Sequence, residues 1–172
     1  MPKGHYQRDT ALLEAGIVKE PDNSRYVYYL AQCYRDSECF DKALGWYEKR
    51  VTMGGWNQEV WSALYQIGRM QEALGCDWRV TMSSYLQAYN FRPSRLEPIY
   101  RIARFHRKHH QFSLGYLFSR LTLEVGYPED ILFVERDVYE KWLPLEYAAC
   151  CRGLGMEVEA NRVVDLIAQK ET

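Results

Sequence analysis

The stretch YVYYLAQCYRDSECFDKALGWY, residues 26–47, decides the fold. In it a small residue, Ala31, is followed three positions later by an aromatic one, Tyr34, and a second small residue, Ala43, comes twelve after the first. The stretch IYRIARFHRKHHQFSLG, residues 99–115, has the same spacing with a histidine at the aromatic position. Self-similarity of this kind is typical of repeat proteins, in which each unit buries its apolar face against its neighbours. The sequence therefore predicts an all-α solenoid of helix pairs.

Composition predicts one well-folded domain or one short repeat array. The 172 residues are 47% hydrophobic and 15% aromatic, which excludes intrinsic disorder. A chain of this length buries about two thirds of its unfolded surface, enough for a substantial core. The formal net charge of −1 gives no general attraction for nucleic acid or for an anionic membrane. We therefore expect no nucleic-acid partner, and recognition of an anion would require a local basic cluster.

The cysteines and the hydropathy pattern favour an intracellular protein. The five cysteines include no C-x2-C pair, so we expect them to be reduced and structural. The sequence begins MPKGHYQRDTALLEAG, without a long apolar run, and no window approaches the ~20 apolar residues of a membrane span. We expect a cytoplasmic chain with no membrane insertion, which could still be attached to a larger, membrane-associated chain.

Turn and capping signals divide the chain into helices. Either Asn23 or Ser24 can cap the amides of one helix, and the glycine pair at 54–55 can close the next. Ser94 and Glu97 have the spacing of a capping box, in which serine caps the helix and glutamate follows three residues later. These signals predict a single array over residues 1–172. Its expected parts are an N-terminal helix at 6–20, repeats at 23–55, 56–93, 94–126 and 138–170, and an inserted arm at 127–137.

Apolar side chains in the N-terminal helix and in the arm indicate that both pack against the array. One apolar stripe of the N-terminal helix is expected to contain Leu12, Leu13, Ile17 and Val18. The arm contains four apolar residues that are too apolar to remain in solvent, namely Ile131, Leu132, Phe133 and Val134. We therefore expect an ordered arm that folds against the helices.

The spacing in the first quoted stretch resembles that of the tetratricopeptide repeat. Ala31 and Ala43 stand where this family has small residues, and Tyr34 and Tyr47 stand where it has aromatic ones. The family's unit is a helix pair of about 34 residues, and such units stack into a right-handed superhelix. The resemblance implies a right-handed α-α superhelix of about four helix pairs, preceded here by one N-terminal helix.

Four arginines occupy one equivalent position in the four first helices. Their spacings along the chain are 34, 38 and 45 residues, and the excesses over 34 match insertions of about four and eleven residues in the loops. In the tetratricopeptide fold, which the chain resembles, this position lines the concave groove. The candidate groove-binding residues are these arginines and their neighbours on the same helices, namely Arg35, Arg69, Arg107, Arg152, Tyr28, Gln32, Gln66, Tyr100 and Arg104.

The arginines admit two interpretations. Guanidinium groups bind carboxylates and phosphates bidentately, so a groove of Arg, Gln and Tyr suits an acidic or extended peptide, or a phosphorylated or nucleotide-bearing group. Alternatively, each arginine pairs with a neighbouring acid, such as Asp36, Glu72 or Glu146, and serves packing and solvation alone. The sequence leaves both open. Glu59 and Glu97, on or beside the same face, further disfavour nucleic acid.

A narrower resemblance is to the repeat region that follows the catalytic domain in many family 2 glycosyltransferases. It implies an accessory module whose partner is a glycosyltransferase catalytic domain. The Asp-x-Asp metal motif of that catalytic domain is absent here, so no catalytic residue can be carried over. The alternative is a free-standing adaptor that binds an acidic or extended peptide in its groove. The resemblance rests on the strings EPDNSRYVYYLAQCYRD (20–36), DKALGWYEKRVTMGGWNQEVWSALYQI (41–67), SYLQAYNFRPSRLEPIYRIARF (84–105) and YPEDILFVERDVY (127–139).

The remaining motifs predict no catalytic, metal or cofactor site. His106 and His110 have the i, i+4 spacing of metal ligands, but two imidazoles are too few and the neighbouring basic residues repel a cation. We expect His106 to be a buried histidine with a hydrogen-bond partner. No local motif arranges a serine with a histidine and an acid. Trp56 and Trp61 are expected in the core rather than on a sugar-stacking platform, and the chain is predicted not to be an enzyme.

Overall fold

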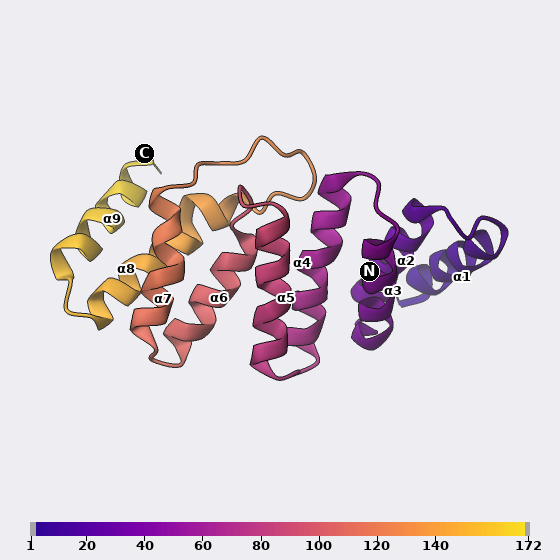
Figure 1. Ribbon diagram of the computed structural model, residues 1–172, viewed down its shortest axis with the longest axis horizontal. Coiled ribbons are helices and arrows are strands. Elements are labelled where there is room, and N and C mark those ends of the chain that lie inside the picture. Colours follow the sequence, from indigo (N-terminus) through magenta and orange to yellow (C-terminus); the bar gives the residue numbers. More distant parts are fainter. Residues whose placement is uncertain (1–2, 171–172) are drawn as a thin grey trace. The chain divides into compact units, whose positions relative to one another are not determined.

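In the computed structural model, which describes residues 3–170, nine α-helices follow one another and no strand occurs among these residues (Figure 1). The predicted all-α fold is confirmed. Residues 1–2 and 171–172, the outermost of the predicted array, lie outside the described part. The elements are α1 (Lys3–Lys19), α2 (Ser24–Asp36), α3 (Phe40–Thr52), α4 (Asn57–Ala73), α5 (Trp78–Phe91), α6 (Glu97–Lys108), α7 (Phe112–Ser119), the 3₁₀ turn η1 (Arg120–Leu123), the π-helical turn η2 (Val138–Trp142), α8 (Leu143–Gly153) and α9 (Glu157–Lys170).

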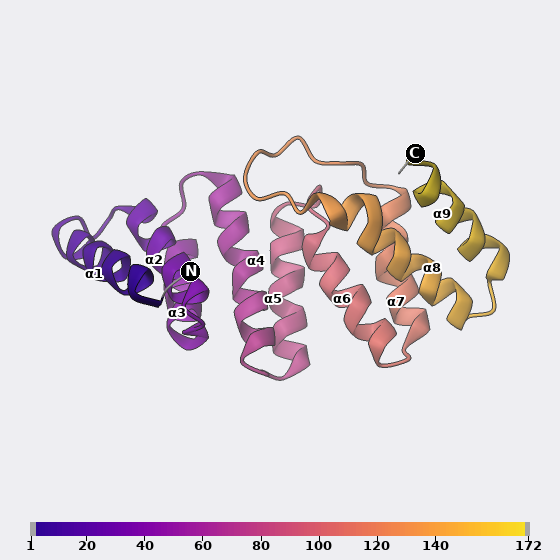
Figure 2. The same cartoon turned by 180° about the vertical axis from the view of Figure 1, so that it is seen from behind.

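The chain divides into two compact units between Ala88 and Tyr89. In unit 1, α1, α2, α3 and α4 pack against one another in chain order, and in unit 2 α6, α7, α8 and α9 do the same (Figures 1 and 2). In addition α2 contacts α4 within unit 1, and α6 contacts α8 within unit 2. The first helices of successive pairs therefore touch each other, as expected when helix hairpins stack.

Small residues allow the helices of unit 1 to approach closely. Ala31 of α2 and Ala43 of α3 are fully buried in one apolar cluster, as their spacing predicted. Gly68 of α4 lies against the ring of Tyr85 in α5, so close that a β-carbon on Gly68 would come within 2.5 Å of that ring. Asn23 caps α2, since its side-chain oxygen accepts a hydrogen bond of 3.3 Å from the amide of Tyr26. The hairpin signals in this part of the sequence were read correctly.

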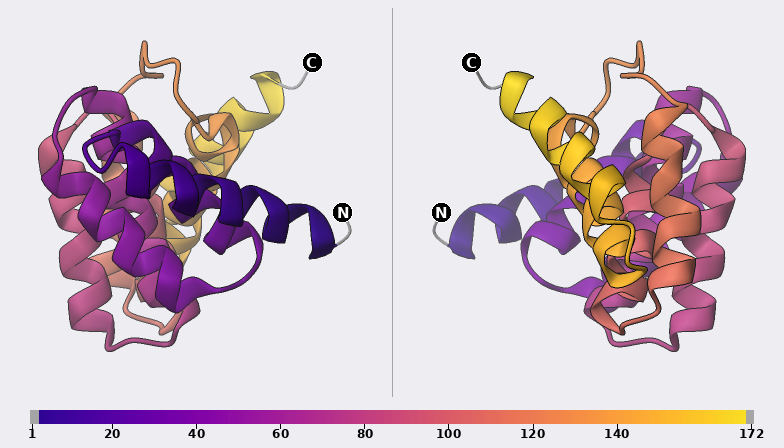
Figure 3. Two further views of the ribbon diagram at one scale, coloured as in Figure 1. Left: turned by 90° about the vertical axis from the view of Figure 1, so that its right-hand side faces the viewer. Right: turned by 90° about the vertical axis from the view of Figure 1, so that its left-hand side faces the viewer.

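Helix α1 packs on α2 through one of its sides (Figure 3, left). Ile17 is buried there, and the hydroxyl of Tyr34 donates a hydrogen bond of 2.5 Å to Glu14 Oε1. Burial and this carboxylate raise the pKa of Tyr34 to about 12. Leu12 and Val18 are 64% and 83% exposed, so the prediction that both lie on a buried stripe is wrong. The reason is that they lie outside the side of α1 that packs on α2.

A buried ion pair that the sequence did not predict joins α3 to α4. The side chain of Arg50 is 1% exposed, and its Nε donates to Glu59 Oε1 at 2.6 Å. A second donor of Arg50 binds the backbone oxygen of Gly54 at 2.7 Å. Because both charged side chains are removed from water, the loss of either one would leave the other as an uncompensated buried charge. The two glycines at 54 and 55 have positive φ angles, so the chain turns tightly enough there for Arg50 to reach that carbonyl oxygen.

The inserted arm of unit 2 is held by a buried polar network centred on Arg95. The guanidinium of Arg95 has no solvent exposure and donates to Glu97 at 2.7 Å and to Asp130 at 3.1 Å. It also donates to the backbone oxygens of Leu132 and Phe133 at 3.1 and 3.0 Å. One side chain next to α6 therefore binds the arm at three successive points. The path of the arm can be followed in Figure 1 as the loop between η1 and η2.

Glu97 completes this network from the first turn of α6. Its carboxylate accepts hydrogen bonds from the hydroxyl of Tyr139 at 2.8 Å and from the amide of Glu135 at 3.2 Å, besides those from Arg95. The predicted capping box is therefore wrong. Helix α6 begins at Glu97 itself, and its N-cap, Leu96, makes no side-chain capping bond. The carboxylate of Glu97 binds Arg95, Glu135 and Tyr139 and makes no capping bond to the start of its own helix.

The arm is ordered, but not by burial of its apolar residues. Ile131 and Phe133 are 83% and 59% exposed, so the expectation that they leave solvent is wrong, whereas Leu132 and Val134 are partly buried. Phe133 also has a φ of 47°, an uncommon backbone conformation for a bulky residue. Its carbonyl oxygen is one of the two in the arm that Arg95 binds. Polar contacts of the arm's backbone and of Asp130 thus hold it in place, while Ile131 and Phe133 face solvent.

Two tryptophans differ in their surroundings. Trp61 is fully buried and stacks on Tyr65 with ring centroids 5.4 Å apart, as expected for a core residue. Trp56 is 43% exposed, so its expected place in the core is wrong. It precedes α4 as the N-cap residue and therefore lies at the edge of the packed helices. Within residues 3–170, no helix is long and apolar enough to cross a membrane.

Candidate functional site

The four arginines lie on the four first helices, as their spacing indicated. Arg35 on α2 and Arg69 on α4 belong to unit 1, and Arg107 on α6 and Arg152 on α8 belong to unit 2. Three of them, Arg35, Arg107 and Arg152, stand in the last turn of their helix. A cation at that end is favoured by the helix dipole. Arginine at these three positions therefore stabilises its own helix, whether or not a ligand binds.

In unit 1 the arginines are engaged by neighbours. Arg35 Nε donates to Asp36 Oδ1 at 2.8 Å, and a second donor reaches the hydroxyl of Tyr47 at 3.4 Å. Burial is the largest single effect on the pKa of Arg35 and lowers it, but the hydrogen bond to Asp36 and the nearby Tyr47, Asp36 and Tyr28 together outweigh it, so the pKa of this guanidinium lies above its ordinary value. Arg69 lies over the ring of Tyr65, 5.9 Å from its centroid.

In unit 2 the pairing extends between helix pairs. Arg107 of α6 forms a two-pronged pair with Glu146 of α8, and the carboxylate side chain is only 9% exposed. This hydrogen bond is the main reason that the pKa of Arg107 is raised. Arg152 donates to the side chain of Asn161 on α9 at 3.3 Å and is 46% exposed. Arg104 lies over the ring of Tyr100 at 5.9 Å. The pairing that the sequence suggested for Asp36 and Glu146 is therefore present.

Three of the candidate groove residues are buried rather than exposed. Tyr28, Gln66 and Tyr100 are 2%, 6% and 7% exposed. The hydroxyl of Tyr28 makes a hydrogen bond of 2.6 Å with Ser62 Oγ on α4, so its polar end is used inside unit 1. The ring of Tyr100 stacks on that of Trp142 in η2. Burial removes these three residues from the surface candidates. The half-exposed or exposed candidates are Gln32, Arg35, Arg69, Arg104, Arg107 and Arg152.

A hollow of about 410 Å³ lies between α1 and α2 in unit 1. Gln32 is the one candidate residue that the sequence had singled out in it. The sequence did not predict the other lining residues of this hollow as a site. Those on α1 come from a helix side that was expected to be buried, and those on α2 stand at positions that carry no repeat signature. The lining residues are Asp9, Leu12, Leu13, Tyr29, Gln32, Cys33 and Asp36.

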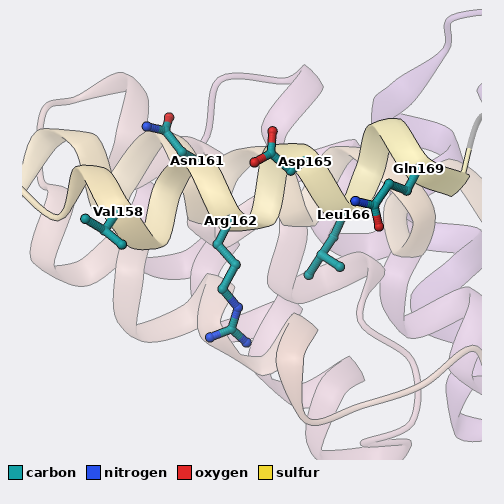
Figure 4. Close-up of a pocket in the computed structure, with 6 residues that line it drawn as sticks. All are labelled: Val158, Asn161, Arg162, Asp165, Leu166 and Gln169. Atoms are coloured by element: carbon teal, nitrogen blue, oxygen red, sulfur yellow. The ribbon is translucent and has the colours of Figure 1, made fainter.

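A second hollow, of about 490 Å³, lies along the outer side of α9 (Figure 4). Arg162 and Leu166 project to one side of the helix, and Asn161 and Asp165 project to the other (Figure 4). The same helix faces the viewer in the right-hand view of Figure 3. Every residue that lines this hollow comes from α9, so it is a shallow surface feature of one helix and not a cleft between two elements.

The histidines and cysteines provide no reactive centre. His106 is 5% exposed and its Nδ1 makes a hydrogen bond of 2.6 Å with Gln111 Oε1, as predicted for a buried histidine. The cysteines are unpaired thiols, and burial raises the pKa of Cys150 to about 11, which keeps this thiol protonated at neutral pH. Among the residues that the structure describes, no group of three or more His, Cys, Asp or Glu is arranged to hold a metal ion.

Comparison with known proteins identifies the fold. No protein-family model matches the chain, and neither does any curated protein. The solved structures that are similar to it include two of MamA. "Crystal structure of MamA protein" aligns with a TM-score of 0.72 at 13% identity and covers 98% of this chain and 84% of that one. "Crystal structure of MamA" gives 0.73 and 14%, with 98% and 90% covered. The likeness establishes a TPR-like helical-repeat fold.

The contacts of Arg107 lead to a first prediction. Replacing Arg107 by glutamate should lower the free energy of unfolding by about 1–3 kcal/mol, because Glu146 would lose its partner and face a like charge in a largely buried place. The matched change Arg152→Glu, at a more exposed side chain, should cost less than about 0.5 kcal/mol. Urea denaturation of both variants measures this difference. Equal stability of the two variants would mean that the Glu146 pair is not structural.

Proposed function

We propose that this chain is a non-catalytic helical-repeat scaffold that binds a protein or peptide through the exposed side chains of its first helices. The observation that carries the proposal is the combination of a well-packed helical frame with half-exposed polar side chains at equivalent positions. In unit 1 these are Gln32, Arg35 and Arg69, and in unit 2 Arg104 and Arg107 are the counterparts. The two solved structures with this fold are of a helical-repeat protein, which supports the same class of function.

The ion pairs change the expected character of this surface. A guanidinium that already binds a carboxylate offers little net positive charge to a ligand. Arg35 and Arg107 are bound in this way by Asp36 and Glu146. We therefore propose recognition through directional hydrogen bonds and stacking rather than through attraction of a strongly acidic partner. Arg69 and Arg104, whose guanidinium carbons lie 5.9 Å from the ring centroids of Tyr65 and Tyr100, are suited to such contacts.

A finer form of the proposal makes the chain an accessory module of a glycosyltransferase, with the catalytic domain as its partner or neighbour. It rests on the resemblance of the four strings quoted above, including the one that contains the arm. The alternative is a free-standing adaptor for an extended peptide. The reading frame around the gene separates the two, because an in-frame catalytic domain upstream supports the accessory module. A start and a stop codon that bound this sequence support the adaptor.

Site-specific crosslinking tests the scaffold proposal. Arg69 and Arg104 are replaced, one at a time, by the photoreactive residue p-benzoylphenylalanine, and the full chain is irradiated in a lysate of its native source. Both positions should capture the same protein, and an excess of unmodified chain should abolish capture. Glu48 on α3 and Ser113 on α7, exposed residues of second helices, are the matched control positions. Equal capture at the control positions would contradict the proposal.

An activity measurement tests the non-catalytic part of the proposal. The purified chain, incubated with sugar nucleotides and Mn²⁺, is expected to give neither transfer nor hydrolysis above the protein-free background. The reason is that residues 3–170 contain no cluster of metal-binding side chains and the sequence contains no Asp-x-Asp motif. Saturable turnover that persists through successive purification steps would show that the chain is an enzyme.

A further inference from the structure

The inserted arm turns two large apolar side chains to solvent. Ile131 is 83% exposed and Phe133 is 59% exposed, while Leu132 and Val134, which alternate with them in the chain, are partly buried. Apolar side chains so open to water gain free energy when a partner covers them. The exposed pair lies on an ordered connecting segment, and such segments commonly carry binding residues.

The backbone that carries this pair is fixed from inside unit 2. The guanidinium of Arg95, which has no solvent exposure, donates to the carbonyl oxygens of Leu132 and Phe133 at 3.1 and 3.0 Å. The φ of 47° at Phe133 lies in the left-handed region, where a bulky residue remains only if its surroundings enforce it. The arm therefore holds the exposed pair in place before a partner arrives, which lowers the entropic cost of docking.

Two carboxylates of the arm are left over when its ion pairs are assigned. Glu129 and Asp137 flank the exposed pair in the chain, and neither makes an ion pair or a hydrogen bond with another residue that the structure describes. Glu135 and Lys141 have partners of their own. The nearby arginines offer these acids little net positive charge, because each already binds another carboxylate: Arg92 and Arg95 bind Asp130, Arg120 binds Glu124, and Arg136 binds Glu140. The charge beside the exposed pair therefore favours a cationic partner.

We propose that the arm docks by inserting Ile131 and Phe133 into an apolar cleft of a partner protein. Lysine or arginine at the rim of that cleft pairs with Glu129 and Asp137. An anionic membrane is a poorer occupant, because its surface repels the same two carboxylates. The inference goes beyond the proposed function and does not depend on it, because this second surface contains none of the first-helix side chains named there.

Three derivatives of β-cyclodextrin test the proposal on the full chain labelled with ¹⁵N. Each is a ring whose apolar cavity admits one phenylalanine side chain, and its rim carries amino groups, hydroxyl groups or carboxylates. At neutral pH the amino derivative should shift the amide signals of residues 129–137 in a saturable way. It should bind about tenfold more tightly than the carboxylate derivative, and about 500 mM NaCl should reduce this preference.

Substitution of Phe133 locates the binding. Phe133→Ala should weaken binding of the amino derivative at the arm about tenfold, because the cavity loses the ring that it encloses. Phe91→Ala, at a phenylalanine of α5 that is 43% exposed, should leave binding at the arm unchanged. Circular dichroism checks that both variants are folded.

Neutral substitutions test the charges. Glu129→Gln with Asp137→Asn should abolish the preference for the amino over the carboxylate derivative, while the cavity still encloses Phe133. Asp41→Asn with Glu48→Gln, at exposed acids of α3, makes the same change in net charge and should leave the preference unchanged.

Equal binding of the amino and carboxylate derivatives, or shifts at residues 129–137 that persist in the Phe133 variant, would overturn the inference. Vesicles of phosphatidylcholine with phosphatidylglycerol probe the membrane as occupant, and vesicle binding that Phe133→Ala abolishes would overturn it as well. Crosslinking at Arg69 and Arg104 tests a different surface. Capture there, without any effect of the cyclodextrins on residues 129–137, would leave the scaffold proposal intact and reject the arm as a docking element.

Discussion

Replacing Arg95 by methionine is expected to lower the free energy of unfolding by about 3–5 kcal/mol. Buried Glu97 would lose its guanidinium partner and keep only the bonds from Tyr139 and Glu135, and Asp130 would keep Arg92 alone of its two arginines. Glu97 has no solvent exposure and Asp130 has 4%, so neither can recover its lost hydrogen bonds from water. The two carbonyl oxygens of the arm would lose their donor as well. The measurement is urea denaturation of the full chain.

A matched exposed pair provides the control for this change. Arg136 and Glu140 are 72% and 45% exposed, and Arg136→Met should change stability by less than about 0.5 kcal/mol. Hydrogen exchange identifies the segment involved. In the Arg95 variant the amides of residues 130–135 should exchange faster, because the arm has lost its attachment. An Arg95 variant as stable as the Arg136 variant would show that the network does not hold the arm.

Replacing Trp61 by alanine is expected to cost about 3–5 kcal/mol, the usual penalty for removing a fully buried aromatic side chain. The effect should reach the candidate site, because Tyr65 would lose the ring against which it stacks, and Arg69 lies over Tyr65. Chemical denaturation measures the stability, and the indole fluorescence of the remaining tryptophans reports the loss of packing.

Trp56→Ala is the control for this second change. This tryptophan is 43% exposed, so its removal should cost less than about 1 kcal/mol. If both substitutions had the same effect, the stack of Trp61 on Tyr65 would not be part of the core. A Trp61 variant that unfolds outright would agree with the expected size, and Trp61→Phe would then give the measurable intermediate case.

The repeat spacing predicted the packing of helices because that packing depends on residues close in sequence. Ala31 and Ala43 belong to one hairpin, and their spacing is set by two helices and one short turn. The arginine positions follow from the same periodicity. The burial of Tyr28 could not be predicted in this way. It depends on Ser62, which belongs to the next pair and comes to the same place only when the hairpins stack.

The arm and the hollow show where local reasoning fails. Ser94 and Glu97 have the spacing of a capping box, but Arg95 and the hydroxyl of Tyr139 compete for the same carboxylate, and the latter lies 42 residues away in the chain. Charged partners in a buried place outweigh a backbone cap. The hollow depends on which side of α1 faces α2, and an amphipathic pattern with exposed leucine and valine does not specify that side.

The central claim is that the exposed side chains of the first helices bind the partner. The most direct measurement is calorimetric titration of the crosslinked partner, once purified, against two double variants. Arg69→Ala with Arg104→Ala should weaken binding about tenfold or more, as expected when two contact residues are truncated. Glu48→Ala with Ser113→Ala, on second helices, should change the affinity less than about twofold. A larger loss of affinity in the Glu48/Ser113 variant than in the Arg69/Arg104 variant would contradict the claim that the first helices bind the partner.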